Sequence, residues 1–212
     1  RHDGVHMHYN QEIGEVVRSN GVVAKAVTSG GVGIPLDCLA VGLGLTMNTE
    51  VLAGTGVRTA TGIICDDRLE TDVKGIFAAG DVAEFYDPIA EMHYRMGTWN
   101  NAGAHGKVAA ANMAGGDVRY HDVPEYSSML FSTQSITQFG VSPELRNDLQ
   151  SVKKVDRETK HYRILYFWKN RLAGVLLLGK GNRAGKRKYL DAIKARTEFP
   201  PSEWQSMLDW TA

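Results

Sequence analysis

The stretch Thr71-Asp-Val-Lys-Gly-Ile-Phe-Ala-Ala-Gly-Asp81 is a short apolar run that closes on a glycine and a carboxylate. A buried strand that ends in Ala-Gly brings bare backbone close to a ligand, and the Asp81 carboxylate can then accept hydrogen bonds from sugar or polyol hydroxyls. If Val82 begins a helix, the amide dipoles of that helix also favour a phosphate there. The pattern alone leaves a second interpretation open, a strand-to-helix turn in which Asp81 is a plain N-cap.

The residues around this stretch alternate between strand and helix patterns, as is typical of an α/β fold. Short apolar runs predict strands at 21–27, 36–45, 62–66 and 75–81, and the run 36–45 is so continuously apolar that we expect burial on both faces. A short helix is expected at 48–54. Small and apolar residues at helical spacing predict a longer helix at 100–113, ended by the two glycines at 115 and 116.

The second half of the chain differs from the first in charge. The whole chain has 24 basic and 24 acidic residues, but residues 151–200 hold 14 basic and 4 acidic ones, which leaves 10 and 20 elsewhere. We therefore expect two units that meet near residue 120. In the second unit, apolar runs at 162–168 and 172–178 predict a hairpin, 185–196 predicts a helix, and Ser202 is expected to N-cap a short terminal helix. The sequence does not decide whether residues 127–139 form a strand or a helix.

Composition limits the class of protein. A formal net charge of zero gives no general attraction to nucleic acid or to an anionic membrane, and we predict neither as a partner. No apolar run reaches the roughly 18 residues of a membrane span. Cys38 and Cys65 are too far apart for a CxxC pair and too few for a disulfide scaffold, so the expected location is a reducing one, the cytoplasm.

Isolated histidines and cysteines carry weaker expectations. His6 and His8 alternate on one strand face, but they lack a neighbouring cluster of ligands and we predict no metal site. Cys38 is expected to be an inert core residue of the run 36–45. The scattered histidines His93, His105, His121 and His161 are expected in surface or capping roles.

Three motifs in order carry a resemblance to a known family. They are Leu39-Ala-Val-Gly-Leu-Gly-Leu-Thr-Met-Asn-Thr-Glu50, Gly62-Ile-Ile-Cys-Asp-Asp-Arg-Leu-Glu-Thr71 and Gly75-Ile-Phe-Ala-Ala-Gly-Asp81-Val-Ala. Together they resemble the carboxy-terminal half of FAD-dependent pyridine-nucleotide oxidoreductases. The segment Arg95-Met-Gly-Thr-Trp99-Asn-Asn101-Ala102 looks like the flavin-facing helix of the branch that includes NADH oxidases, ferredoxin reductases and apoptosis-inducing-factor-like proteins.

The resemblance implies roles in binding FAD. Asp81 would hydrogen-bond the ribityl chain, Gly80 would allow close approach, and Val82 would supply an amide near the pyrophosphate. Thr98 and Trp99 would lie beside the isoalloxazine ring, at a helix end that favours negative charge. Trp99 has an alternative reading as core or interface packing, and Asn101, expected to set the helix against the flavin, could equally be a surface or capping group. No residue is assigned as catalytic, because hydride transfer needs no protein acid or base.

Departures from the family pattern shape the expected organisation. Gly97 and Met47 stand where Glu and Pro are usual, and neither GxGxxG fingerprint is present. We therefore predict the tail of a nicotinamide-dinucleotide-binding domain at 1–46, the end of an FAD-binding domain at 47–120 and an interface domain at 121–212. The expected fold is a partial Rossmann-like α/β domain followed by an antiparallel sheet with helices.

The function expected from these observations is that of the carboxy-terminal portion of an FAD-dependent oxidoreductase, inactive alone, with NAD(P)H as co-substrate of the complete protein. An alternative is a non-catalytic assembly module that pairs with itself, and another is one chain of a split flavoenzyme. Self-association, or pairing with missing amino-terminal domains, is expected in these cases. The basic stretch with Lys180, Arg183, Lys186, Arg187 and Lys188 either steers an acidic electron-carrier protein or is a solvated face.

Overall fold

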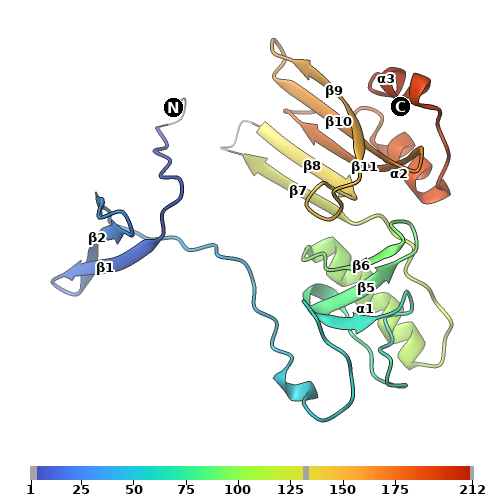
Figure 1. Cartoon of the computed structure of the whole chain (residues 1–212), viewed down its shortest axis with the longest axis horizontal. Helices are drawn as coiled ribbons and strands as arrows, with labels where there is room; N and C mark the ends of the chain where they lie inside the picture. The colour runs from blue at the N-terminus through green and yellow to red at the C-terminus, as the bar shows by residue number, and fades with distance from the viewer. Residues whose placement is uncertain (1–3, 131–133, 211–212) are drawn as a thin grey trace. The chain divides into compact units, whose positions relative to one another are not determined.

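The computed structural model describes residues 4–130 and 134–210, which Figure 1 traces from blue at the amino-terminal end to red at the carboxy-terminal end. The chain divides into two compact units, Arg1–Thr46 and Met47–Ala212, and each is described by itself. Across the described residues, no helix has the length and apolar character needed to cross a membrane.

The first unit is built on a three-stranded antiparallel sheet in the order β1-β2-β3, formed by Ile13–Ser19, Val22–Thr28 and Gly33–Pro35. Asn20 and Gly21 join β1 to β2 with φ of 50° and 83°. Two consecutive positive φ values are the requirement of a type I′ hairpin turn, for which Asn-Gly is a favoured pair. The predicted strand at 21–27 is confirmed as β2.

The predicted strand at 36–45 is wrong. In the structure these residues join no sheet, and Leu43 in the middle of the run is 92% exposed. Cys38 is exposed too, so it is not the core residue that the sequence predicted. A strand buried on both faces needs neighbours at its edges and a layer over each face, and the described part of the first unit supplies neither. Apolar composition therefore did not decide the conformation of this run.

The second unit begins with a small sheet and a long helix. Strand β4 (Ile63–Cys65) pairs in parallel with β5 (Ala83–Asp87), and β5 pairs antiparallel with β6 (Met92–Tyr94). Helix α1 (Trp99–Met113) is followed by the glycines at 115 and 116, as predicted. The helix predicted at 48–54 is a single 3-10 turn, η1 (Glu50–Leu52).

The chain around Asp81 differs from the prediction. Residues 75–81 make only an isolated bridge, between Glu70 and Phe77, before the 3-10 turn η2 (Gly80–Val82). Val82 leads into β5 and not into a helix, so Asp81 caps no helix. The residues of β5 alternate between buried and half-buried, which is the period of a strand, and its pairing with β4 and β6 places these residues in a sheet and not in a helix.

A five-stranded antiparallel sheet fills most of the remaining chain, in the order β7-β8-β11-β10-β9. Its strands are β7 (Glu125–Leu130), β8 (Gln134–Gly140), β9 (Gln150–Asp156), β10 (His161–Trp168) and β11 (Arg171–Leu178). The predicted hairpin at 162–178 is confirmed, with Lys169 and Asn170 at φ of 49° and 59° in its turn. For residues 127–139 the sequence left the secondary structure undecided; the described part lies in β7 and β8, and residues 131–133 lie outside the described residues.

Two helices follow the sheet. The predicted helix at 185–196 is α2 (Lys186–Ala195), and the terminal helix is a 3-10 turn, η3 (Pro201–Glu203), that continues into α3 (Trp204–Met207). Ser202 does not N-cap the terminal helix, because Pro201 already starts the 3-10 turn and places Ser202 inside it.

Two hydrophobic cores hold the second unit together. One packs α2 and α3 on the five-stranded sheet, with the Trp204 ring stacked 4.1 Å from that of Phe167. The other gathers residues of β4, β5 and α1 and includes Val141 and Ala173 from the region of the larger sheet. Residues on both sides of position 120 therefore share a core.

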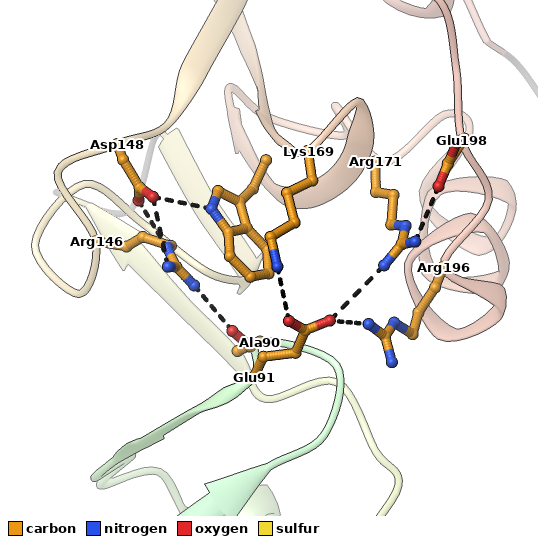
Figure 2. A network of polar contacts seen from close by, with 9 residues as sticks. Ala90, Glu91, Arg146, Asp148, Lys169, Arg171, Arg196 and Glu198 are labelled. Atoms are coloured by element: carbon orange, nitrogen blue, oxygen red, sulfur yellow. Dashed lines mark hydrogen bonds and ion pairs between the residues drawn. The ribbon is translucent and has the colours of Figure 1, made fainter.

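A polar network lies where the β5–β6 turn meets the larger sheet (Figure 2). The Glu91 carboxylate pairs with Lys169 at 2.9 Å, with Arg171 at 3.7 Å and with Arg196. Beside it, the Arg146 guanidinium lies 3.7 Å from the centre of the Trp168 ring. One carboxylate thus links the β5–β6 turn to the β10–β11 turn and to the end of α2.

Candidate functional site

The turn η2 is packed directly on helix α1. Gly80 is buried with φ of +77°, and a β-carbon built on it would lie 3.4 Å from the Ala102 Cβ. Its backbone N–H donates to His105 Nδ1 at 3.4 Å. Ala102 and His105 are three residues apart on one face of α1, so the helix contacts the turn at two successive points. Glycine suits this position because it tolerates the positive φ and the close approach.

Asp81 presents its carboxylate to solvent beside the start of α1. Its side chain is exposed and has no hydrogen-bond partner within residues 4–130 and 134–210. A β-carbon at Gly97 would lie 3.4 Å from Asp81 Oδ2, so the carboxylate faces bare backbone there. Arg95 donates to the Asp81 backbone oxygen at 3.4 Å, and Val82 is half-buried before β5. The Asp81 oxygens are therefore available to hydroxyl donors of a ligand.

Helix α1 begins next to this carboxylate. Thr98 is its N-cap, in extended conformation, and Thr98 Oγ1 accepts from the Asn101 N–H at 3.4 Å. Trp99 is 89% exposed, which excludes the alternative that it is a core residue of the described chain. The first turn of a helix has backbone N–H groups without intrahelical acceptors and carries partial positive charge. The positive end of α1 thus follows directly after the residue that the Asp81 carboxylate faces, and it carries an exposed indole.

Asn101 fixes the start of α1 from the inside. It is buried, its amide donates to the Met96 carbonyl at 2.9 Å, and its Oδ1 accepts from the Tyr120 hydroxyl at 2.6 Å. Neither a surface nor a capping role describes it. Because the amide bonds both to the segment before the helix and to Tyr120, it holds the entry to α1 in one arrangement.

His105 was expected at the surface or in a cap, and that expectation is wrong. Its side chain is fully buried, with the rings of Phe85 and Tyr120 at 4.5 Å and 4.6 Å. Burial lowers the pKa of His105 to about 4, so the ring is neutral at ordinary pH. Helical spacing could have revealed it: Asn101, His105 and Ala109 recur every four residues on the buried face.

The structure also places the other candidate groups. Cys65 is buried, and burial raises the pKa of its thiol to about 12, so it is not a nucleophile at neutral pH. Across the described residues, no three His, Cys, Asp or Glu side chains gather as metal ligands. In the basic stretch, Lys186 pairs with Glu125 at 2.6 Å, whereas Lys180, Arg183 and Arg187 are exposed.

A family model described as pyridine nucleotide-disulphide oxidoreductase matches residues 1–106, half of the chain. The chain belongs to this family. The resemblance expected from the motifs at 39–83 is thereby confirmed. Membership of this family implies FAD and a pyridine nucleotide as cofactors.

Individual relatives agree with the family assignment. The NADH-rubredoxin oxidoreductase of Clostridium acetobutylicum is 27% identical over 188 residues, which cover 87% of this chain and 42% of the relative. The rhodocoxin reductase of Rhodococcus erythropolis is 30% identical over 131 residues, covering 62% of this chain and 31% of the relative. The chain therefore spans less than half the length of these family members.

Solved structures confirm the expected fold class. The ferredoxin reductase for the CYP199A2 system from Rhodopseudomonas palustris matches with a TM-score of 0.76 at 25% identity, over 95% of this chain and 48% of that one. A putidaredoxin reductase in covalent complex with putidaredoxin matches with a TM-score of 0.78 at 20% identity, over 92% of this chain and 46% of that one. At that identity the match supports the fold alone.

Proposed function

We propose that this chain forms part of an FAD-dependent NAD(P)H oxidoreductase that passes electrons to a small electron-carrier protein. The observation that carries the proposal is the free Asp81 carboxylate beside the positive end of α1. In this proposal residues 1–46 belong with the nicotinamide-binding domain, 47–120 with the FAD-binding domain and 121–212 with the interface domain.

The residues of the turn fit the polyol part of a flavin. Gly80 is buried against α1, and its lack of a side chain lets the turn pack close to Ala102 at the start of that helix. The Asp81 oxygens have no described partner and would accept hydrogen bonds from ribityl hydroxyls, while the Val82 amide would lie toward the pyrophosphate. A charged acceptor makes stronger hydrogen bonds than a neutral one, so Asp81 would contribute most of the affinity from this turn.

The start of α1 fits the ring end of the cofactor. Trp99 is exposed and would pack against the isoalloxazine, and Thr98 fixes the first turn on which Trp99 stands. Bound FAD would supply the hydride-accepting ring, which is chemistry that no side chain of this chain provides. The partial positive charge of the helix end would stabilise negative charge near it.

The names of relatives support an electron-carrier protein as the acceptor. Relatives include rubredoxin reductases from Clostridium acetobutylicum and Ectopseudomonas oleovorans, and ferredoxin-NAD(+) reductase components of dioxygenase systems. Exposed Lys180, Arg183 and Arg187 would attract an acidic carrier over distance and so raise the rate of encounter.

Binding of FAD to the full 212-residue chain tests the proposal. The chain is mixed with FAD and filtered, and the visible absorbance of the retained fraction is measured for the natural sequence, for Asp81→Asn and for the matched exposed-carboxylate control Asp191→Asn. We expect Asp81→Asn to weaken binding by about tenfold or more, since it removes a charged acceptor, and the control to bind as the natural chain does. Equal binding by Asp81→Asn and the natural chain would refute the assigned role, and a natural chain that retains no FAD would refute an FAD site made by this chain.

A further inference from the structure

His105 is a buried polar group that the proposed function does not use. The Gly80 N–H donates to its Nδ1, and its Nε2 has no hydrogen-bond partner in the part of the chain that the structure describes. A neutral imidazole that accepts at Nδ1 carries its proton on Nε2. The ring is therefore an acceptor toward Gly80, the residue that precedes Asp81 in the turn η2.

The surroundings allow the ring little freedom. Phe85 and Tyr120 meet it edge-on, at interplanar angles of 77° and 90°, from β5 and from the segment after α1. The ring itself projects from α1, which also fixes the Ala102 contact with Gly80. Full burial and close packing restrict rotation of the ring, so its Nδ1 is a fixed point against which the turn is placed.

The turn η2 needs a fixed contact because the backbone at Gly80 is free to rotate. Gly80 lies at φ of +77°, a region that glycine enters and leaves without steric cost. Asp81 is the next residue, so a rotation at Gly80 swings the carboxylate away from Gly97 and the start of α1. Packing on Ala102 limits how near the turn comes to the helix, whereas the hydrogen bond sets its orientation.

We propose that His105 is a positioning residue: it fixes the Gly80 amide to α1 and so holds the Asp81 carboxylate beside the first turn of that helix. The step from a placed carboxylate to a placed flavin rests on the proposed function. His105 itself touches no ligand in this arrangement.

Two substitutions separate positioning from packing. His105→Asn retains an acceptor oxygen close to the place of Nδ1, whereas His105→Leu fills the space without an acceptor. Val141→Ala is the matched control, because Val141 is buried in the same hydrophobic core but is neither an aromatic neighbour of His105 nor a hydrogen-bond partner of the turn. All three variants lose core contacts, and only His105→Leu loses the acceptor.

Hydrogen exchange of the Gly80 amide is the first measurement, made on the full chain without FAD and referred to the Ala102 amide of the same variant. We expect the Gly80 amide to exchange about tenfold or more faster relative to Ala102 in His105→Leu, and close to the natural ratio in His105→Asn and in Val141→Ala. An unchanged ratio in His105→Leu, or an equal change in Val141→Ala, would overturn the proposal, because either result makes His105 a packing residue.

FAD affinity is the second measurement, and it separates this inference from the proposed function. If the natural chain binds FAD, we expect His105→Leu to weaken binding by about tenfold and His105→Asn to restore most of it. Loss of Gly80 protection with unchanged FAD affinity would overturn the link from the turn to the cofactor. If the natural chain binds no FAD, the proposed function fails, and the exchange ratio still decides whether His105 positions the turn.

Discussion

The Asp81 carboxylate lies against Gly97, where a β-carbon would come 3.4 Å from Asp81 Oδ2. Gly97, which precedes the N-cap of α1, has no side chain and thus leaves one side of the carboxylate uncovered. In the family that the motifs resemble, a glutamate is usual at this position, whereas the glycine here places no side chain against Asp81. The size of the side chain at position 97 should therefore control access to the carboxylate.

A series of substitutions at Gly97 tests this relationship. Its φ is not in the left-handed region, so Ala and Val can be accommodated without backbone strain there. We expect Gly97→Ala to lower FAD affinity by about threefold or less and Gly97→Val by about tenfold, while the free energy of unfolding changes by about 0.5 kcal/mol in either case. Titration with FAD and urea unfolding measure the two effects. An affinity that does not follow side-chain size would contradict the open setting of Asp81.

Charge reversal in the basic stretch tests the proposed electron carrier. Lys180 and Arg183 are exposed, so Lys180→Glu with Arg183→Glu should leave folding intact. We expect association with an acidic electron-carrier protein to slow by about tenfold at low salt and to lose most of its dependence on ionic strength. Stopped-flow mixing over a range of salt concentrations gives the rates. Lys74→Glu with Lys107→Glu is the control, because both residues are exposed and Lys107 lies on α1, outside the basic stretch; equal slowing there would show a general charge effect.

The elements that the sequence predicted correctly are set by neighbours in the chain. Helix α1 starts at Thr98, whose hydroxyl caps it, and ends before a pair of glycines. The β10–β11 hairpin turns at Lys169 and Asn170, polar residues between two apolar runs. Helix caps and two-residue turns depend on only a few neighbouring residues, so the sequence predicts them without knowledge of the tertiary structure.

The errors arise where distant residues decide. Residues 36–45 have the composition of a buried strand, but a strand forms only beside partners, and the described chain provides none for it. Val82 leads into β5 because β5 pairs with β4, a contact that spans about twenty residues. His105 carries a local signal, its spacing from Asn101 on the buried face, yet its partner Gly80 lies far away in the sequence.

Folding stability should fall in mild acid because of His105. The folded-state pKa is lowered to about 4 from 6.5, so the unfolded chain binds a proton between these values that the folded chain does not. Stability is therefore full above about pH 6.5 and falls by about 3 kcal/mol as the pH drops to about 4. The buried Asp87 acts in the opposite sense, because burial raises its pKa and the folded state keeps its proton longer.

Comparison with a variant isolates the histidine contribution. Urea unfolding is measured for the natural chain and for His105→Asn between about pH 7 and about pH 4.5. The natural chain should lose stability more steeply than the variant over this window, since other titrating groups are common to both. Parallel curves would show that protonation of His105 does not oppose folding.

The two cysteines should differ sharply in reactivity. Cys38 is exposed, whereas Cys65 is buried and the pKa of its thiol is raised to about 12, mainly by burial. A thiol reagent requires both access and thiolate, so it should modify only Cys38 in the folded chain and both cysteines in denaturant. Mass spectrometry after brief alkylation, with Cys38→Ser as the control, counts the modified thiols. Rapid labelling of Cys65 in folded Cys38→Ser would contradict its burial.

Glu91 should matter more to stability than an ordinary surface carboxylate. Its side chain is 29% exposed and pairs with Lys169, Arg171 and Arg196 (Figure 2). These cations hold the pKa of the Glu91 carboxyl below its usual range, and the hydrogen bond from Lys169 is the largest cause. Glu91→Gln leaves three clustered cations without their shared carboxylate, and we expect it to lower the free energy of unfolding by about 1–2 kcal/mol, less at high salt. A double-mutant cycle with Arg196→Gln, followed by urea unfolding, measures the coupling between the two side chains. The prediction fails if the two losses are additive and if Glu91→Gln costs no more stability than the exposed control Asp191→Asn. The network would then be a set of independent surface pairs that does not link the β5–β6 turn to the larger sheet.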